Sequence, residues 1–260
     1  MISFLTTADD TEETYLMNEY NMTDQVAIVT GAARGFGLAI SERLMQSGVR
    51  VFGWDQDPFP IADDQRFTGV ECIDVTERTT VQLAVDAVFD VAGRIDILVN
   101  NAGINGPQEP VEHYPLESWD RVIAVDLTAV FDLTRAVVPY MKSVRYGRIV
   151  TIASQAGKEG IANVSAYNAA KAGAIGFMKG IASELATFNI TANSITPTLA
   201  ETDLMNEMSE EYIAGIKERT LMGRLCHAEE VANMVAFVAS PACSYSTGAC
   251  FDVSGGRAQY

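Results

Sequence analysis

The sequence predicts an α/β fold, a single domain built on a doubly wound parallel sheet with helices on both faces. Short β-branched apolar segments alternate with helical patterns along the chain. Several of these segments are apolar almost throughout, as expected for strands of a parallel sheet that is covered on both faces. No linker, internal repeat or low-complexity segment interrupts the alternation, so the 260 residues predict one domain.

The elements follow from this pattern in order. Residues 1–22 are expected to form an acidic N-terminal extension, because Met1 to Tyr20 contains five carboxylates and no basic residue, which is wrong for a secretory or mitochondrial signal. The folded domain is expected over residues 23–260. A helix is expected over roughly Phe36 to Gln46, directly after the first strand. Strands are expected near residues 26–30, 50–54, 69–73, 96–100, 148–153, 190–195 and 248–252.

Composition excludes several classes of protein. The net charge of −16 and the pI near 4.4 argue against nucleic acid or an anionic membrane surface as partner. No apolar run approaches the length of a membrane span. The four cysteines lack metal-like spacing and there are only two histidines, so no metal site is expected. The cysteines are expected to be reduced thiols of a cytoplasmic protein.

A glycine-rich turn follows the first strand, from Gly31 to Gly37 (G-A-A-R-G-F-G). Its glycines would let the backbone approach a pyrophosphate, and the next helix would offer its N-terminal amides to that anion. The next strand ends at Asp55, whose carboxylate would accept hydrogen bonds from an adenosine ribose and repel a 2′-phosphate. The pattern therefore predicts NAD in preference to NADP. Arg34 suits either cofactor, and Asp57 is an alternative for the role of Asp55 unless it merely belongs to a turn.

Tyr167 and Lys171 lie four residues apart, and Ser154 lies thirteen residues upstream of Tyr167. On a helix this spacing places the phenol and the ammonium on one face. A phenol has a reference pKa near 10, so acting as a base at pH 7 needs a depression of about 3 units, or about 4 kcal/mol, which an adjacent cation supplies. Such pairs are also common on surfaces, but the Ala- and Gly-rich run from Ala169 to Gly180 indicates a closely packed helix. With Ser154 holding a substrate oxygen, the three residues predict acid/base chemistry on an alcohol or carbonyl.

In this order, the motifs resemble those of the short-chain dehydrogenase/reductase family, over about residues 23–256. The motifs are T-G-A-A-R-G-F-G (Thr30 to Gly37), C-I-D-V (Cys72 to Val75), N-N-A-G (Asn100 to Gly103), Ser154, Y-N-A-A-K (Tyr167 to Lys171) and the segment Pro197 to Thr202. The resemblance implies a Rossmann-like fold, hydride transfer to or from nicotinamide, a small-molecule substrate and a homo-oligomer, expected to be a tetramer.

The resemblance also implies roles for single residues. Tyr167 would be the general acid/base, Lys171 would lower its pKa and bind the nicotinamide ribose, and Ser154 would steady the substrate oxygen. Asp74 and Val75 would face the adenine, Asn101 to Gly103 would line the adenosine ribose, and Thr202 would contact the carboxamide. The implied cofactor residues are Gly31, Arg34, Gly35, Phe36, Gly37, Asp55, Asp74, Val75, Asn101, Ala102, Gly103, Tyr167, Lys171, Pro197 and Thr202.

Two positions depart from the family pattern. Asp126 stands in V-D-L-T where an Asn in N-L-T is common, at a position that supports a water reaching the lysine largely through its backbone carbonyl. The side-chain part of that role is therefore in doubt, whereas a proton relay is still expected. Pro197-Thr198 replaces the usual Pro-Gly and would stiffen the hinge of the loop that covers the nicotinamide, which is still expected to close.

The substrate pocket is expected to include Asn105, Ser154, Gln155 and Tyr167, together with the stretch from 202 to 219. The polar Asn105 and Gln155 favour a hydroxylated substrate. Arg257 and Tyr260 lie on a short C-terminal tail that we expect either to help close a neighbouring subunit's active site or to be frayed.

Three further segments resemble NAD-dependent dehydrogenases of sugar acids such as 2-keto-3-deoxy-L-fuconate or L-rhamnonate: N-G-P (Asn105 to Pro107), S-Q-A-G-K-E-G (Ser154 to Gly160) and S-G-G-R-A-Q-Y (Ser254 to Tyr260). A 3-oxoacyl carrier protein reductase is the main alternative, disfavoured by the acidity of the chain and by Asp55. A steroid or polyol dehydrogenase and a non-catalytic nicotinamide-sensing regulator are the others.

Overall fold

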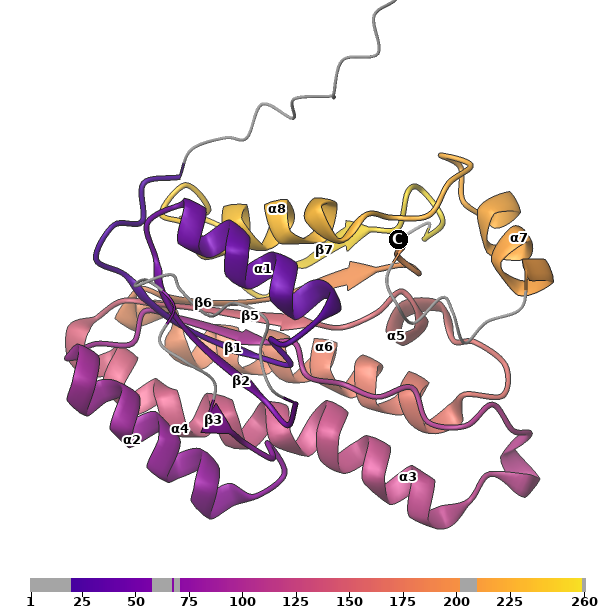
Figure 1. Ribbon diagram of the computed structural model, residues 1–260, viewed down its shortest axis with the longest axis horizontal. Coiled ribbons are helices and arrows are strands. Elements are labelled where there is room, and N and C mark those ends of the chain that lie inside the picture. The colour runs from indigo at the N-terminus through magenta and orange to yellow at the C-terminus, as the bar shows by residue number, and fades with distance from the viewer. Residues whose placement is uncertain (1–19, 58–66, 68–70, 202–209, 259–260) are drawn as a thin grey trace, which may run out of the picture.

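A computed structural model of the protein describes residues 20–57, 67, 71–201 and 210–258 (Figure 1). Most of the acidic extension and the candidate residues Thr202 and Tyr260 lie outside these ranges. The described residues form a seven-stranded sheet with the order β3-β2-β1-β4-β5-β6-β7. The strands are β1 (Val26–Thr30), β2 (Arg50–Asp55), β3 (Glu71–Cys72), β4 (Ile97–Asn100), β5 (Gly147–Ile152), β6 (Ile190–Pro197) and β7 (Cys250–Val253). All pairings are parallel, which confirms the predicted fold class.

Helices cover both faces of the sheet, as predicted. Figure 1 shows α1 and α8 on one face and α2, α4 and α6 on the other. The longer helices are α1 (Gly35–Gln46), α2 (Arg78–Ala92), α3 (Leu116–Ile123), α4 (Ala129–Val144), α6 (Ser165–Leu185), α7 (Glu210–Arg219) and α8 (Ala228–Ala239). Shorter elements are η1 (Val111–His113), the π-helical η2 (Ala124–Thr128), α5 (Ala156–Glu159) and η3 (Ala186–Phe188). No helix in the described ranges is long and apolar enough to cross a membrane.

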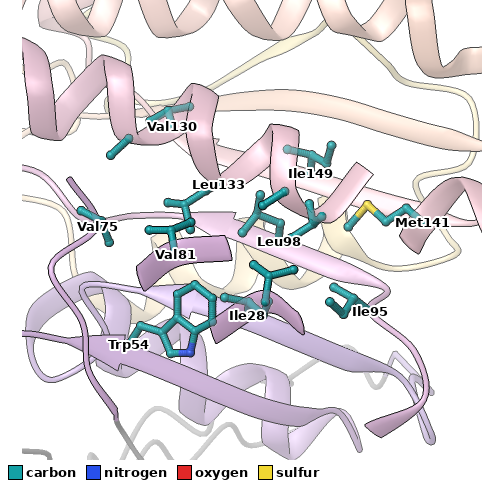
Figure 2. Packing of buried hydrophobic residues seen from close by; sticks show 14 of the residues in the cluster. Ile28, Trp54, Val75, Val81, Ile95, Leu98, Val130, Leu133, Met141 and Ile149 are labelled. Carbon is teal, nitrogen blue, oxygen red and sulfur yellow. The ribbon is translucent and has the colours of Figure 1, made fainter. Parts of the chain in front are cut away.

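Alternate strand residues build two separate cores. In β1, Val26 and Ile28 pack with α2, α4 and α6, whereas Ala27 and Val29 pack with α1 and α8. Figure 2 shows the first core, where Ile28, Leu98 and Ile149 of three strands meet helix side chains. Because successive side chains of a strand point to opposite faces, a strand contributes to both cores when it has apolar residues at both odd and even positions.

Two residues of the predicted extension pack against the domain. Met22 is fully buried in the core under α1 and α8, and its backbone N–H donates to the Ser47 carbonyl oxygen at 2.9 Å. The ring of Tyr20 lies 6.2 Å from that of Phe237 on α8, with the Arg43 guanidinium over its face at 5.8 Å. The core contacts of the described chain therefore begin before residue 23.

An ion pair at the start of α8 makes stability depend on pH. Arg224 donates to both carboxylate oxygens of Glu230, at 2.6 and 2.8 Å, and the His227 N–H donates to Oε2 at 2.9 Å. The Arg224 bonds, opposed by partial burial and assisted by His227, lower the pKa of Glu230 to about 2. A carboxylate whose pKa is lowered on folding stabilises the protein above its unfolded pKa, and this contribution is lost as pH falls from about 5 toward 2.

We therefore expect Glu230→Gln to lower the Tm at pH 7 by about 2–6 °C, because the charge-assisted bonds from Arg224 are lost, while the glutamine amide oxygen can still accept from the His227 N–H. The difference in Tm between this variant and the wild type should become smaller as the pH falls from about 5 toward 2. Thermal unfolding measured across this range tests it. Glu229→Gln, which changes an exposed carboxylate in the same helical turn, should leave the Tm nearly unchanged, and equal effects of the two variants would contradict the assignment.

Candidate active site

The candidate site residues gather at one edge of the sheet. In a parallel sheet the carboxyl ends of all strands meet at the same edge, and the crevice opens where the strand order reverses, which here is between β1 and β4. The glycine turn follows β1, Asp55 ends β2, and the N-N-A-G turn follows β4. Ser154 follows β5, and Pro197 ends β6. The fold thus brings together segments that lie far apart in the sequence.

The glycine turn brings α1 close to the end of β1. Gly31 and Gly35 adopt positive φ angles of 62° and 54°, which residues with a Cβ rarely do. A Cβ on Gly37 would lie 1.9 Å from the Gly31 carbonyl oxygen, so the first turn of the helix can approach only as glycine. A Cβ on Gly31 would lie 2.9 Å from the Ala102 Cα. The first and third glycines are therefore required by close packing.

Side chains tie this turn to its neighbours. The Asn101 amide donates to the carbonyl oxygens of Thr30 and Gly31, at 2.9 and 3.0 Å. The Thr30 hydroxyl accepts from the backbone N–H groups of Asn101 and Ala102, at 3.0 and 3.1 Å. The Asn101 side chain supports the glycine turn, a role that the sequence did not indicate.

Asp55 is fixed in place by three backbone groups. Its Oδ2 accepts from the Ala33 N–H at 2.8 Å, and its Oδ1 accepts from the N–H groups of Gln56 and Asp57, at 2.7 and 3.2 Å. The partly exposed carboxylate is therefore held beside the glycine turn. Asp57, the alternative candidate, instead lies 3.6 Å from the Arg34 guanidinium in an exposed ion pair.

Asp74 and Val75 differ in what they offer to a ligand. The Asp74 carboxylate accepts from the backbone N–H and hydroxyl of Thr76, at 2.9 and 2.6 Å, and lies 3.6 Å from the Arg121 guanidinium. Burial opposes ionisation, but these partners outweigh it and lower the pKa of Asp74. The Val75 side chain points into the hydrophobic core (Figure 2), so only its backbone can contact an adenine.

Two of the candidate catalytic residues lie on α6, and the third lies just before the short helix α5. Tyr167 and Lys171 occupy successive turns of α6, with Lys171 Nζ 5.5 Å from the centre of the Tyr167 ring. Ser154 precedes α5, and its Oγ accepts from the Ala156 N–H at 3.1 Å. A Cβ on Gly157 would lie 2.7 Å from the Lys171 backbone carbon, so α5 rests directly on the turn that carries the lysine. The Ala- and Gly-rich sequence is what permits this packing.

Lys171 is buried and held by two groups. Its Nζ donates to the Ile152 carbonyl oxygen at 3.1 Å and lies 3.1 Å from Oδ2 of the fully buried Asp126. Asp126 Oδ1 accepts from the Ile104 N–H at 2.8 Å. Burial disfavours the ammonium, but the charges of Asp126 and Tyr167 outweigh it and raise the pKa of Lys171. The direct contact was not predicted, and the only sequence signal was a carboxylate within the apolar run V-D-L-T.

The candidate substrate residues are less uniform. Asn105 is exposed beyond the N-N-A-G turn. Gln155 is buried, donates its amide to the Glu159 carboxylate, and its backbone N–H donates to the Pro197 carbonyl oxygen at 3.1 Å, so its side chain is engaged within its own helix. Arg257 is partly exposed, and its backbone N–H donates to the Ser254 carbonyl oxygen at 3.3 Å. Thr198 is also buried, and its backbone N–H donates to the Val253 carbonyl oxygen at 3.3 Å.

The residues present fit a nicotinamide dinucleotide. The glycine turn leads directly into the N-terminus of α1, whose free backbone N–H groups suit a pyrophosphate, and Gly35 and Gly37 place no side chain on this first turn. Asp55 lies beside this turn, on the side of β2. At the other end of the crevice, Tyr167, Ser154 and the buried Lys171 provide a phenol, a hydroxyl and a cation.

Comparisons with known proteins agree with this geometry. Residues 25–213 match the family described as short chain dehydrogenase. The chain is 40% identical to a 2-dehydro-3-deoxy-L-rhamnonate dehydrogenase (NAD(+)) of Sphingomonas sp. (strain SKA58), over 90% of this chain and 95% of that protein. It is 38% identical to the 3-oxoacyl-acyl-carrier-protein reductase of Escherichia coli (strain K12), over 91% and 98%. The ligand-free aldohexose dehydrogenase of Thermoplasma acidophilum superposes with a TM-score of 0.85 at 32% identity, over 92% and 96%.

Proposed function

The chain belongs to the short-chain dehydrogenase/reductase family and is an oxidoreductase acting on CH–OH groups, and from this premise we propose that it oxidises a secondary hydroxyl of a sugar acid with NAD. The proposed substrates are 2-keto-3-deoxy-L-sugar acids such as the fuconate or rhamnonate. The observation that carries the proposal is the buried Lys171 beside Tyr167, with the Ser154 turn packed on the same helix.

Each side chain has a distinct part in the proposed reaction. A bound nicotinamide dinucleotide would supply the hydride acceptor or donor. Tyr167 takes the proton of the substrate hydroxyl during oxidation and returns it during reduction. The Lys171 ammonium stabilises the anionic phenol. Because Ser154 Oγ already accepts from the Ala156 N–H, its own O–H remains to donate to the substrate oxygen. An intact set of these three groups favours an enzyme over a regulator that only senses the cofactor.

The preference for NAD rests on Asp55. A carboxylate held beside the glycine turn accepts hydrogen bonds from a ribose and repels a 2′-phosphate. Asp55→Asn removes the charge but can still accept from the Ala33 N–H. We expect it to raise the ratio of kcat/KM with NADP to that with NAD at least about 10-fold, equivalent to about 1.4 kcal/mol. Initial rates with both cofactors measure this ratio.

The control for that experiment is Asp90→Asn, which removes an exposed carboxylate from the remote helix α2. It should leave the cofactor ratio within about twofold, since a distant exposed charge is screened. An unchanged ratio in Asp55→Asn would overturn the assignment of NAD specificity to Asp55.

The sugar-acid substrate is supported by the Sphingomonas relative, which acts on 2-dehydro-3-deoxy-L-rhamnonate with NAD(+). Because the Escherichia coli relative is a 3-oxoacyl-acyl-carrier-protein reductase, a carrier-protein thioester is the second candidate substrate. The net charge of −16 disfavours docking of an acidic carrier. A panel of sugar acids, polyols and 3-oxoacyl thioesters, each assayed with NAD and NADP, tests the substrate class. Activity confined to the thioesters would overturn the proposal.

We also propose that the protein is a cytoplasmic homotetramer. Phe131 on α4 is 44% exposed and meets Phe177 on α6 edge to face at 5.9 Å, which leaves an aromatic pair on the outer surface of these helices. Such exposed aromatic groups favour subunit contact. The four cysteines are free, as in proteins of a reducing compartment. Light scattering after gel filtration measures the assembly, and a monomeric mass at micromolar concentration would contradict it.

A further inference from the structure

Asp126 lies within the catalytic centre without any path of its own to solvent. The carboxylate is fully buried, and Lys171 is only 5% exposed. Asp126 Oδ1 is occupied by the Ile104 N–H at 2.8 Å, which fixes the carboxylate in one orientation. Oδ2 lies 3.1 Å from Lys171 Nζ, and no other described group donates to it. The two side chains therefore form a direct ion pair in which Oδ2 is committed to the lysine.

This ion pair lies directly beneath Gly103, which follows β4 at the edge of the sheet where the glycine turn also lies. Gly103 is exposed at the end of the N-N-A-G turn. A Cβ on Gly103 would lie 3.0 Å from Asp126 Oδ2 and 3.1 Å from Lys171 Nζ. No side chain of this residue separates the pair from the crevice. Both charges therefore act on groups in the crevice through a short, poorly screened distance.

We propose that Asp126 is a positioning residue that sets the charge of the catalytic centre: its carboxylate holds the Lys171 ammonium in place and, by compensating its charge, moves the working range of Tyr167 to higher pH. The inference rests on the proposed acid/base role of Tyr167, but not on the identity of the substrate.

The sign of the effect follows from electrostatics. Tyr167 must be a phenolate, close to Lys171, before it can take the proton of the substrate hydroxyl. Beside an uncompensated ammonium the new negative charge is strongly favoured, whereas beside a neutral ion pair it is less so. Among the elements that pack against α6, α5 carries Lys158 and Glu159, α3 carries Glu117, Asp120 and Arg121, and η2 carries Asp126. Of these described groups, Asp126 is the one that forms an ion pair with Lys171 Nζ, at 3.1 Å, and Tyr167 lies on α6 itself. β5 contributes only the Ile152 carbonyl.

The same carboxylate also protects the lysine from losing its proton. Its charge raises the pKa of Lys171 against the effect of burial. Removing the negative charge therefore lowers the pH at which the lysine deprotonates and the pH at which the phenolate forms. Both limbs of a pH–rate profile should move in one direction, toward acid.

Asp126→Asn is the decisive variant, because an amide has the same size and can accept from the Ile104 N–H. In the oxidation direction with saturating cofactor, we expect the acidic limb of the kcat/KM profile to move down by about one pH unit, the shift that one charge several ångströms away produces at a partly buried site. A decline at alkaline pH should appear earlier than in the wild type. Asp126→Ser, which also removes the charge and leaves a smaller side chain, should shift in the same direction and replaces the Asn variant if that one folds poorly.

The matched control is Asp132→Asn on α4. Asp132 is also buried and accepts from Arg78 Nε at 2.8 Å, in an ion pair between α2 and α4. The Asp132→Asn substitution removes the charge of a buried carboxylate without changing the surroundings of Lys171. The control should lose stability, whereas its pH–rate profile should superimpose on that of the wild type.

A second readout needs neither cofactor nor substrate. The ultraviolet absorbance of tyrosinate is titrated in the cofactor-free protein, and the contribution of Tyr167 is the difference between each protein and the same protein carrying Tyr167→Phe. The Tyr167 transition should lie about one pH unit lower in the Asp126→Asn background. A Tyr167 transition and a rate profile that do not move, or that move to higher pH, would overturn the inference. Failure of the proposed function would instead appear as an active Tyr167→Phe enzyme, whatever the titration shows.

Discussion

Replacing Tyr167 with phenylalanine should lower kcat at least about 100-fold, because general acid–base catalysis contributes about 10²–10⁴ to a rate. The substitution removes only the phenol hydroxyl group. The ring remains available to pack against the buried cluster of Tyr114, Val122, Ala166 and Ala170. We therefore expect the variant to fold and to bind NADH within about twofold of the wild-type affinity. Stopped-assay rates and cofactor fluorescence separate the two effects.

Tyr114→Phe is the matched control for this experiment. Tyr114 belongs to the same buried cluster, and its hydroxyl has no hydrogen-bond partner among the described residues. Removing it should leave kcat within about twofold, since no catalytic proton passes through this group. A Tyr167→Phe enzyme that keeps more than about a tenth of its rate, a change of about 1.4 kcal/mol in barrier, would contradict the assigned role of Tyr167.

Gly37→Ala should abolish tight cofactor binding and also destabilise the fold. A Cβ at this position would lie 1.9 Å from the Gly31 carbonyl oxygen and 2.7 Å from Asn101 Nδ2, so the turn and its supporting amide must both move. Overpacking of this kind costs about 1–3 kcal/mol. We expect the Tm to fall by about 2–10 °C and the Kd for NADH to rise at least about 100-fold.

Calorimetric titration with NADH and thermal unfolding measure both parts of this prediction. The control is Gly180→Ala on α6, where a Cβ would meet no atom within 4 Å. Because alanine favours a helix interior by about 1 kcal/mol over glycine, this variant should be as stable as the wild type or more so. Normal NADH affinity in Gly37→Ala would show that α1 need not approach the turn so closely.

The sheet could be predicted because burial on both faces leaves a direct record in the sequence. In β1 the four residues from Val26 to Val29 are apolar and all five positions are buried, and each of the seven strands lies within a few residues of its predicted place. The position of Ser154 at the carboxyl edge of the sheet could be expected from the parallel arrangement of the strands. Its closeness to the helix that carries Tyr167 and Lys171 follows from the packing of α5 on α6.

Contacts between residues that lie far apart in the sequence could not be predicted from the sequence. Asp126 and Lys171 meet across the η2 and α6 elements, and nothing local in V-D-L-T specifies that partner. The direction of the Val75 side chain depends on the turn between β3 and α2 and on the core that α2 helps to form. Tyr20 and Met22 were assigned to the extension because its acidity dominates the composition, whereas their packing depends on α1 and α8. In each case the deciding partner comes from another element.

The side chains of Thr30, Asp55 and Asn101 bind backbone groups of segments other than their own, and together they hold the ends of β1, β2 and β4 around the glycine turn. Because these bonds share one piece of backbone, the loss of one changes the strain on the others. Substitutions at these three positions should therefore be non-additive. Whether a substitution at one of these positions is tolerated should therefore depend on which residues stand at the other two.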